Sequence, residues 1–182
     1  MNKWVESLVR LTGWSGERRH SYDWDAVRRE LGTPLPSDYV ELVEIFGPGW
    51  FDSAIDVLVP GSGRHLGLVE VTRERRDAFE YWFDRWDDEL PGAEIPASVR
   101  SGEPVIAWGE TGSAVYLFWR CSPLLEPDRW PVVIHAFNEP WDEHDMTTTE
   151  FLASLLSDSL RAEYFSYLPR KRHVFEPLDS LR

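Results

Sequence analysis

"ELGTPLPSDYVELVEIFGPGWF", residues 30–51, sets the order of the first elements of this chain. Gly32 is placed to end a preceding short helix, since glycine readily adopts the left-handed conformation that closes helices. Pro34 and Pro36 predict an extended spacer, and Pro36 can occupy the first position of a second helix. Apolar residues then repeat at helical spacing as far as Gly47; they are Tyr39, Leu42, Val43 and Phe46. The stretch predicts two helices joined by a proline spacer, followed by a Gly-Pro-Gly loop that carries a Trp-Phe pair.

Further helices are indicated by apolar periodicity and by capping residues. Asp23 and Thr72 are each predicted to cap a helix, and Thr147 with Glu150 has the spacing of a capping box. The tail from Glu163 onward shows no clear periodicity. The predicted helices cover residues 2–11, 24–31, 36–46, 72–89 and 147–160.

Strands are indicated by short runs of β-branched and aromatic residues. They cover residues 54–59, 66–71, 105–109, 114–120 and 132–137. These runs lie too close together for repeated helical crossovers between parallel strands. We therefore expect an α+β fold with a mainly antiparallel central sheet and helices packed around it, gathered mostly on one side.

Length and composition predict one folded domain spanning residues 1–182. A chain of 182 residues with 42% hydrophobic and 14% aromatic content can bury about 70% of its unfolded surface. Its single cysteine, Cys121, cannot form an internal disulfide, which is usual in a reducing compartment. Glu6 and Arg10 interrupt the apolar pattern near the N-terminus, which is unlike a signal peptide, and no apolar run reaches membrane-spanning length. We expect a cytoplasmic protein, and the sequence makes no prediction of oligomeric state.

The net charge of −13 bears on the class of partner. With 32 acidic against 19 basic residues, the chain is poorly suited to direct nucleic-acid binding or to an anionic membrane. The same charge attracts basic proteins. A protein partner is therefore favoured.

The stretch "HAFNEPWDEHD" holds the densest collection of possible metal ligands, from His135 to Asp145. It lacks a recognised ligand spacing, so a solvated acidic loop is the favoured interpretation and a metal-dependent enzyme a less favoured one. "PGSGRHLG" lacks the ending of a phosphate-binding loop, and no serine-nucleophile motif is present. We predict a non-enzymatic protein with no metal, no cofactor and no catalytic residues.

Acidic residues are concentrated in segments that lack basic ones, such as Glu30–Gly63 and Glu139–Glu150. Solvated faces account for part of this pattern. The other interpretation is an electronegative docking surface in which aromatic side chains lie beside carboxylates, a mixture typical of interface hot spots. The candidate partner-binding residues are Trp50, Asp52, Asp56, Glu110, Glu139, Trp141, Asp142, Glu143 and Asp145.

Five motifs in order resemble the SUKH superfamily, bacterial immunity proteins related to the Smi/Knr cell-wall regulators. They are "LGTPLPSDYVELVEIFGPGWF", "IDVLVP", "VIAWGETGSAVYLFW", "VVIHAF" and "TTTEFLASLL". The resemblance spans about residues 23–160, with the N-terminal helix 2–11 and the tail 163–182 as extensions. Phe46 departs from the asparagine that the family often has before the helix-ending glycine. The long helix near residues 73–89 also lies outside these motifs.

The resemblance implies an α+β fold without catalytic residues. It further implies an immunity protein that neutralises a toxin by binding it, and many such toxins are nucleases. The partner would then be a basic toxin domain whose phosphate-binding cleft an acidic protein can occupy. The alternative is a Smi/Knr-like regulatory domain that binds a host protein.

Overall fold

The fold is that of a computed structural model. The structure describes residues 1–16, 20–61, 67–83, 99, 102–136, 139, 141–169 and 171–178, with the backbone alone for 81–83. Its α-helices are α1 (Lys3–Thr12), α2 (Trp24–Leu31), α3 (Ser37–Phe46), α4 (Leu68–Phe83) and α7 (Thr148–Leu156). Short 3-10 helices are η1 (Pro127–Arg129) and η2 (Glu163–Phe165). No helix in these described ranges is long and apolar enough to cross a membrane.

A seven-stranded antiparallel sheet forms the centre of the fold, in the order β6-β5-β4-β3-β2-β1-β7. The strands are β1 (Gly49–Phe51), β2 (Ile55–Val57), β3 (Val105–Thr111), β4 (Val115–Arg120), β5 (Val132–Ala136), β6 (Asp142–His144) and β7 (Phe175–Pro177). The α+β class and the antiparallel sheet are thereby confirmed. Strands near 54–59, 105–109, 114–120 and 132–137 were predicted, whereas β1, β6 and β7 were not.

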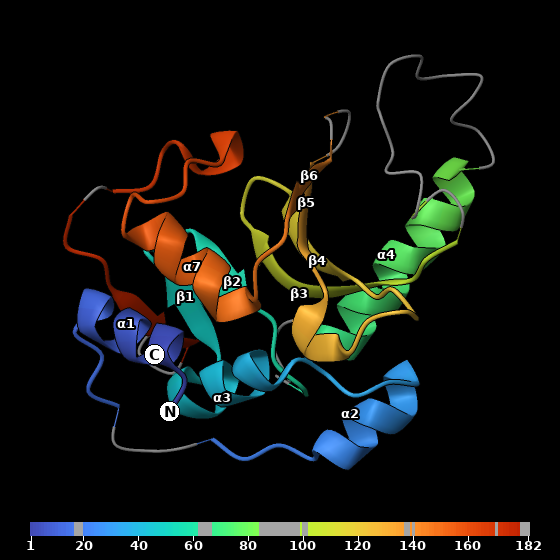
Figure 1. Ribbon diagram of the computed structural model, residues 1–182, viewed down its shortest axis with the longest axis horizontal. Coiled ribbons are helices and arrows are strands. Elements are labelled where there is room, and N and C mark those ends of the chain that lie inside the picture. The colour runs from blue at the N-terminus through green and yellow to red at the C-terminus, as the bar shows by residue number, and fades with distance from the viewer. Residues whose placement is uncertain are drawn as a thin grey trace.

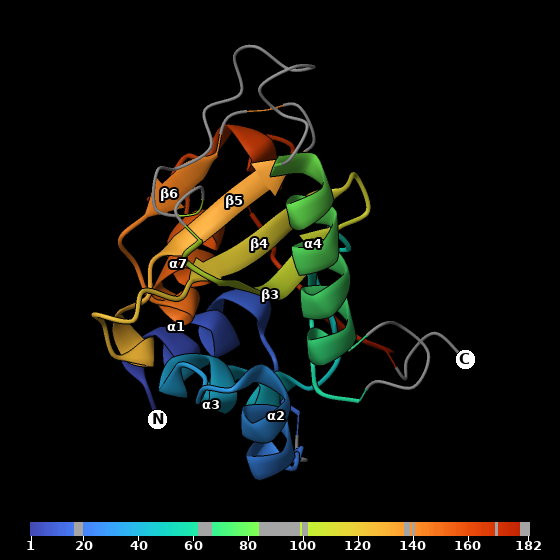
Figure 2. The same ribbon diagram turned by 90° about the vertical axis from the view of Figure 1, so that its right-hand side faces the viewer.

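Helices cover both faces of the sheet (Figures 1 and 2). Helix α4 packs on one face against β3, and α1, α3 and α7 pack together on the other face. The expectation that helices gather mostly on one side is wrong. The physical reason is that both faces of β3 to β5 carry apolar side chains, so each face needs a cover.

Buried aromatic side chains form the core between the sheet and α7. Trp108 stacks on Trp119 with ring centroids 6.2 Å apart, and both are fully buried. The indole of Trp119 donates a 2.8 Å hydrogen bond to the Thr148 hydroxyl and meets Tyr39 edge-on at 4.8 Å. Two large rings from the sheet are therefore anchored to α3 and α7, which gives this face much of its buried area.

Helix α4 begins earlier than the sequence pattern indicates. The run at 66–71 was predicted as a strand, but α4 starts at Leu68, so that prediction is wrong. Leu68 is fully buried, and the β-branched run lies on the part of α4 that packs against the sheet. Thr72 is inside this helix rather than at its cap, and its hydroxyl accepts a 3.1 Å hydrogen bond from the Ala107 amide of β3. Phe79, farther along this helix, is buried, and residues 84–89 of the predicted helix lie outside the described ranges.

The predicted caps are confirmed for α2 and α7. The Asp23 carboxylate accepts from the Ala26 amide at 2.9 Å, and the Thr147 hydroxyl accepts from the Glu150 amide at 3.4 Å. Helix α7 ends at Leu156, four residues before the predicted end, in a turn that is closed by serine hydrogen bonds.

Asp38 of α3 fixes the start of α7. Its buried carboxylate accepts from both the amide (2.7 Å) and the hydroxyl (2.9 Å) of Thr149. A carboxylate at the N-terminus of a helix satisfies a donor that has no partner within the helix, and it also interacts favourably with the helix dipole.

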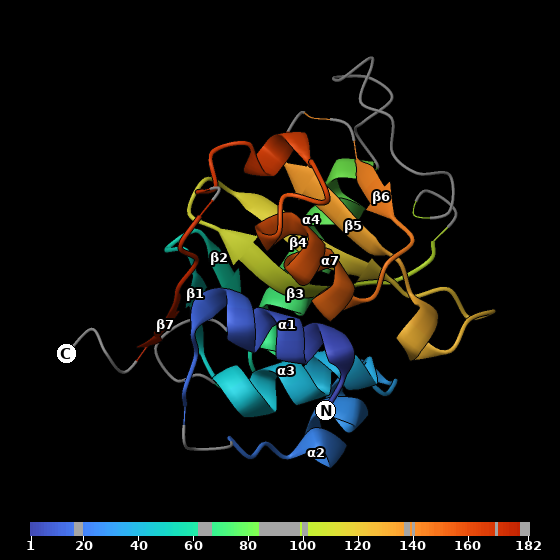
Figure 3. The same ribbon diagram turned by 60° about the vertical axis from the view of Figure 1, so that its left-hand side comes forward.

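The segments on either side of residues 23–160 both pack against that stretch (Figure 3). In α1, Val5 and Leu8 are fully buried, and the helix lies against α7 and α3. In the tail, β7 pairs with β1, and Phe175 packs against Phe46 and Phe51. The core therefore includes residues from both ends of the described chain.

Candidate functional site

The predicted partner-binding residues separate into distinct places. Trp50, Asp56 and Glu110 lie in one row across the sheet. Glu139, Trp141 and Asp142 line a pocket beside the β6 edge. Asp52 and Glu143 are bound within the fold, and Asp145 is exposed after β6.

The row runs across five strands on the α4 face. Direct cross-strand partners are Trp50 with Asp56, Asp56 with Glu110, Glu110 with Tyr116, and Tyr116 with His135. Partners directly opposite each other in an antiparallel sheet share a face and lie in side-chain contact range. Five predominantly polar side chains thus form one line, which we call the sheet row.

The sheet row is partly withdrawn from water. Burial, and next the Glu110 charge, raises the pKa of Asp56 to about 7. At the other end, burial and the Arg75 charge lower the pKa of His135 to about 4. The Arg75 guanidinium lies over the Tyr116 ring, 4.3 Å from its centroid. Burial therefore disfavours the charged form of both Asp56 and His135.

Asp52 does not lie on the surface predicted for it. It is in the turn after β1, and only 2% of its side chain is exposed. Its carboxylate accepts from the Val174 amide at 2.8 Å and lies 2.7 Å from Nδ1 of His173. Asp52 therefore fastens the C-terminal segment to the sheet, because its hydrogen-bonding capacity is used there.

Glu143 also pairs with another residue of the chain, although 37% of its side chain is exposed. It forms a bidentate pair with Arg120, at 2.9 Å and 2.8 Å, and Glu103 binds the same guanidinium at 2.7 Å. These carboxylates raise the pKa of Arg120 above its usual value, with Glu143 contributing most. The network ties β6 to β4, so Glu143 has a structural role.

The pocket at the β6 edge, which we call the acidic pocket, has a volume of about 720 Å³. It lies between the end of β5, the start of β6 and the segment around η2. Its lining residues are Ala136, Glu139, Trp141, Asp142, Arg161, Glu163 and Tyr164. Three carboxylates and two aromatic rings share this pocket with one guanidinium.

Two features of this pocket are the negative charge around Tyr164 and the packing of the Trp141 ring. Burial, and then the charges of Glu139, Asp142 and Glu163, raises the pKa of the Tyr164 phenol. The Trp141 ring is fixed by His135 at 4.4 Å between centroids and by Phe79 at 5.3 Å. A rigid aromatic wall beside negative charge is suited to a cationic side chain, through cation–π contact and charge-assisted hydrogen bonds.

The metal-ligand types of the His135–Asp145 stretch do not converge. His135 meets Phe79 of α4, whereas His144 meets Phe151 of α7, so the two imidazoles lie on opposite faces of the sheet. Nε2 of His144 is 3.1 Å from the Asp142 carboxylate, but without hydrogen-bond geometry. Across the described ranges, no three His, Cys, Asp or Glu side chains are grouped as metal ligands. The segment expected as a solvated loop contains β6 instead.

Sequence reasoning missed the η2 side of the acidic pocket. Glu163 and Tyr164 lie in the C-terminal tail and Arg161 lies just before it, and no sequence motif includes them. The signal was present, because "EY" at 163–164 is the same pairing of acid and aromatic that selected Trp141 and Asp142.

Comparison with known proteins found no match to a family model, a curated protein or a solved structure.

Proposed function

We propose that this chain is a non-catalytic protein-binding domain of the immunity type, which neutralises a basic toxin domain by occupying its phosphate-binding cleft. The resemblance of residues 23–160 to the SUKH superfamily motivates this proposal. The net charge of −13 supports it, since a basic partner is attracted over long range.

The observation that carries the proposal is the acidic pocket. Glu139, Trp141 and Asp142 were selected from the sequence as contact residues, and all three line it. Their carboxylates are joined by Glu163, and the combined charge acts on the Tyr164 phenol. A basic side chain of the partner would find both a counter-charge and an aromatic surface there.

Co-expression with a toxin gene encoded next to this gene tests the proposal. We expect the wild-type chain to protect the producing bacterium and Glu139→Lys with Glu163→Lys to protect it poorly. The control is Glu6→Lys with Glu126→Lys, which makes the same charge change at exposed sites outside the pocket. Failure of the wild type to protect would contradict the toxin assignment.

A host partner is the alternative within the same binding class. Where the gene has no toxin neighbour, a pull-down from the native host with identification by mass spectrometry separates the two assignments. A basic toxin domain supports immunity, whereas a host regulatory protein supports a Smi/Knr-like regulatory role.

A further inference from the structure

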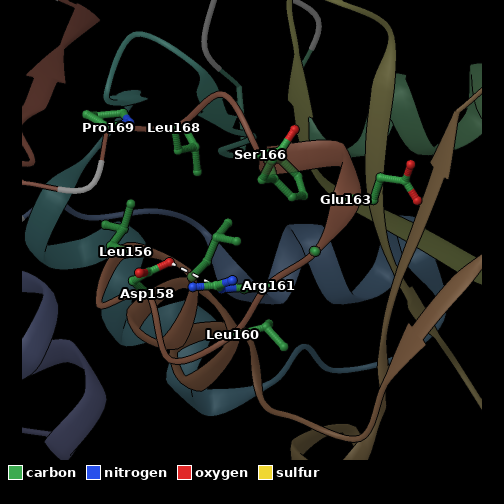
Figure 4. A pocket seen from close by; sticks show the side chains of 11 residues that line it. Leu156, Asp158, Leu160, Arg161, Glu163, Ser166, Leu168 and Pro169 are labelled. Carbon is green, nitrogen blue, oxygen red and sulfur yellow. Dashed lines mark ion pairs between the residues drawn. The ribbon is translucent and has the colours of Figure 1, made fainter.

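A second pocket, which we call the leucine pocket, shares two lining residues with the acidic pocket but is lined by more apolar side chains. Figure 4 shows this pocket from close by. It has a volume of about 380 Å³ and lies between the end of α7 and the segment that follows it. Figure 4 shows Leu156, Leu160 and Leu168 around it. The remaining lining residues are Leu155, Asp158, Arg161, Ala162, Glu163, Phe165, Ser166 and Pro169.

The turn after α7 builds the leucine pocket before any partner binds. Asp158 has a left-handed φ of 56°, and the amides of Ser159 and Leu160 both donate to the Ser154 carbonyl at 3.0 Å. Phe165 is buried, whereas Leu160 and Leu168 are half-buried. A pocket held by backbone hydrogen bonds needs little ordering on binding, which favours affinity.

The two pockets share walls. Arg161 and Glu163 line both, so the leucine pocket and the acidic pocket are neighbours along the segment after α7, and we call the pair of pockets the groove. Arg161 forms only a 3.9 Å ion pair with Asp158, and 77% of its side chain is exposed. It can therefore move aside for a cation from a partner.

We propose that this groove binds a protein segment in which an apolar side chain stands close to an arginine, the arginine entering the acidic pocket and the apolar side chain the leucine pocket. The inference rests on the proposed function, because it specifies the partner segment that the same surface recognises. Charge complementarity selects the occupant, since three carboxylates against one guanidinium disfavour an acidic peptide.

Arginine matches the acidic pocket better than lysine does. Its planar guanidinium stacks on aromatic rings such as Trp141 and Tyr164, and it binds carboxylates in a bidentate manner. Arg120 and Glu143 already make such a pair a short distance along β6.

Selection from a random 12-residue peptide library displayed on phage, with the full chain as bait, tests the proposal. We expect selected peptides to be enriched in arginine, with a leucine, isoleucine, methionine or phenylalanine close by in the peptide. Two variants separate the pockets. Glu139→Lys, at a residue that lines the acidic pocket and not the leucine pocket, should abolish arginine enrichment. Ser166→Tyr, which fills the leucine pocket from an exposed position, should abolish only the apolar enrichment.

Affinity measurements with a selected peptide complete the test. Replacing its apolar residue by serine should weaken binding to the wild type about tenfold, because a buried aliphatic side chain is lost, and should leave binding to Ser166→Tyr nearly unchanged. Leu168→Gln provides a second variant that should give the same pattern.

The outcomes distinguish the two proposals. Arginine enrichment without apolar neighbours, or with an apolar preference that survives in Ser166→Tyr, overturns the two-pocket inference and leaves the proposed function standing. Wild-type selection that yields no basic peptides, or basic peptides whose affinity neither variant changes, contradicts both.

Discussion

The acidic residues of the sheet row and those of the acidic pocket have the same chemistry but different surroundings. Asp56 is within a strand, half-buried beside Glu110, and its pKa is raised to about 7. Glu139 and Glu163 are exposed at the edge of the fold, around a cavity of about 720 Å³. Carboxylates buried in a sheet act mainly on stability, whereas carboxylates around an open pocket are available to a partner.

The largest effect is expected on binding, from reversing charge in the acidic pocket. Glu139→Lys with Glu163→Lys should weaken binding to the proposed basic partner about 100-fold, because two attractive contacts become repulsive. Titration calorimetry measures the change, and Glu6→Lys with Glu126→Lys is the matched control. Equal losses in both double variants would mean that net charge, and not the pocket, determines affinity.

A large effect on stability, with none on binding, is expected from Asp52→Ala. Loss of a buried carboxylate that binds His173 and the Val174 amide should lower the free energy of unfolding by about 2 kcal/mol. Asp52→Asn should cost less, since asparagine tolerates the positive φ of 54° and can still accept from Val174. Urea denaturation measures both values. Weaker binding of the proposed partner by folded Asp52→Asn would contradict this purely structural role of Asp52.

Asp56→Asn should change the pH dependence of stability. The pKa of Asp56 in the folded state is about 7, against 3.8 for an ordinary aspartate, so the folded state retains the proton between these values. Stability from this group therefore falls as pH rises through that window. The variant removes the loss and should gain about 1 kcal/mol near pH 8 relative to about pH 5, after allowance for solvent screening.

The effect of His135 on the pH dependence of stability has the opposite sign and should become visible in the Asp56→Asn variant. Its pKa is lowered from 6.5 to about 4, so its contribution is present above pH 6.5 and is lost as pH falls toward 4. With Asp56 replaced, stability should rise with pH across this window. Asp25→Asn, on the exposed side of α2, corrects for the removal of one negative charge. If the free energy of unfolding of Asp56→Asn depended on pH as it does in the wild type, the raised pKa of Asp56 would not account for the loss of stability at high pH.

The smallest effect is expected from Arg161→Gln. Removing the one guanidinium that lines the acidic pocket should strengthen binding of a basic partner about threefold, because a repulsive charge is lost. Competition binding with the wild type measures the difference. Weaker binding would indicate that Arg161 contacts an acidic group of the partner.

Local signals in the sequence predicted most of the helical half of the fold. Asp23 and Gly32 delimit α2 as expected, and Pro36 with Gly47 delimits α3. Each of these signals depends on residues within a few positions of the boundary. The strand at 66–71 was wrong because the first turn of α4 is rich in β-branched residues that are buried against the sheet, so tertiary packing overrides propensity.

Long-range pairing accounts for what the sequence did not predict. Strand β6 has the sequence Asp-Glu-His and is ordered by pairing with β5 and by Arg120 on β4. Strand β7 includes Pro177, which is tolerated because β7 is at the sheet edge. The partner of Asp52 is 121 residues away in the chain, and nothing local indicates that its carboxylate is buried.

The candidate site could be predicted only in part, again because segments distant in the chain meet there. Pairing of aromatic and acidic residues within one segment identified Glu139, Trp141 and Asp142, but the facing wall at Glu163 and Tyr164 comes from another segment. The end of α7 and the turn that follows it determine where the segment around Glu163 meets the segment around Trp141.

The ionic-strength dependence of association tests the central claim most directly, which is that the acidic pocket attracts a basic partner. Stopped-flow measurement of the association rate constant with the proposed basic partner should show a steep fall as salt is added. The fall should be much shallower in Glu139→Lys with Glu163→Lys and unchanged in Glu6→Lys with Glu126→Lys. A wild-type rate constant that is independent of salt, or a slope that the pocket variant retains in full, would contradict the account.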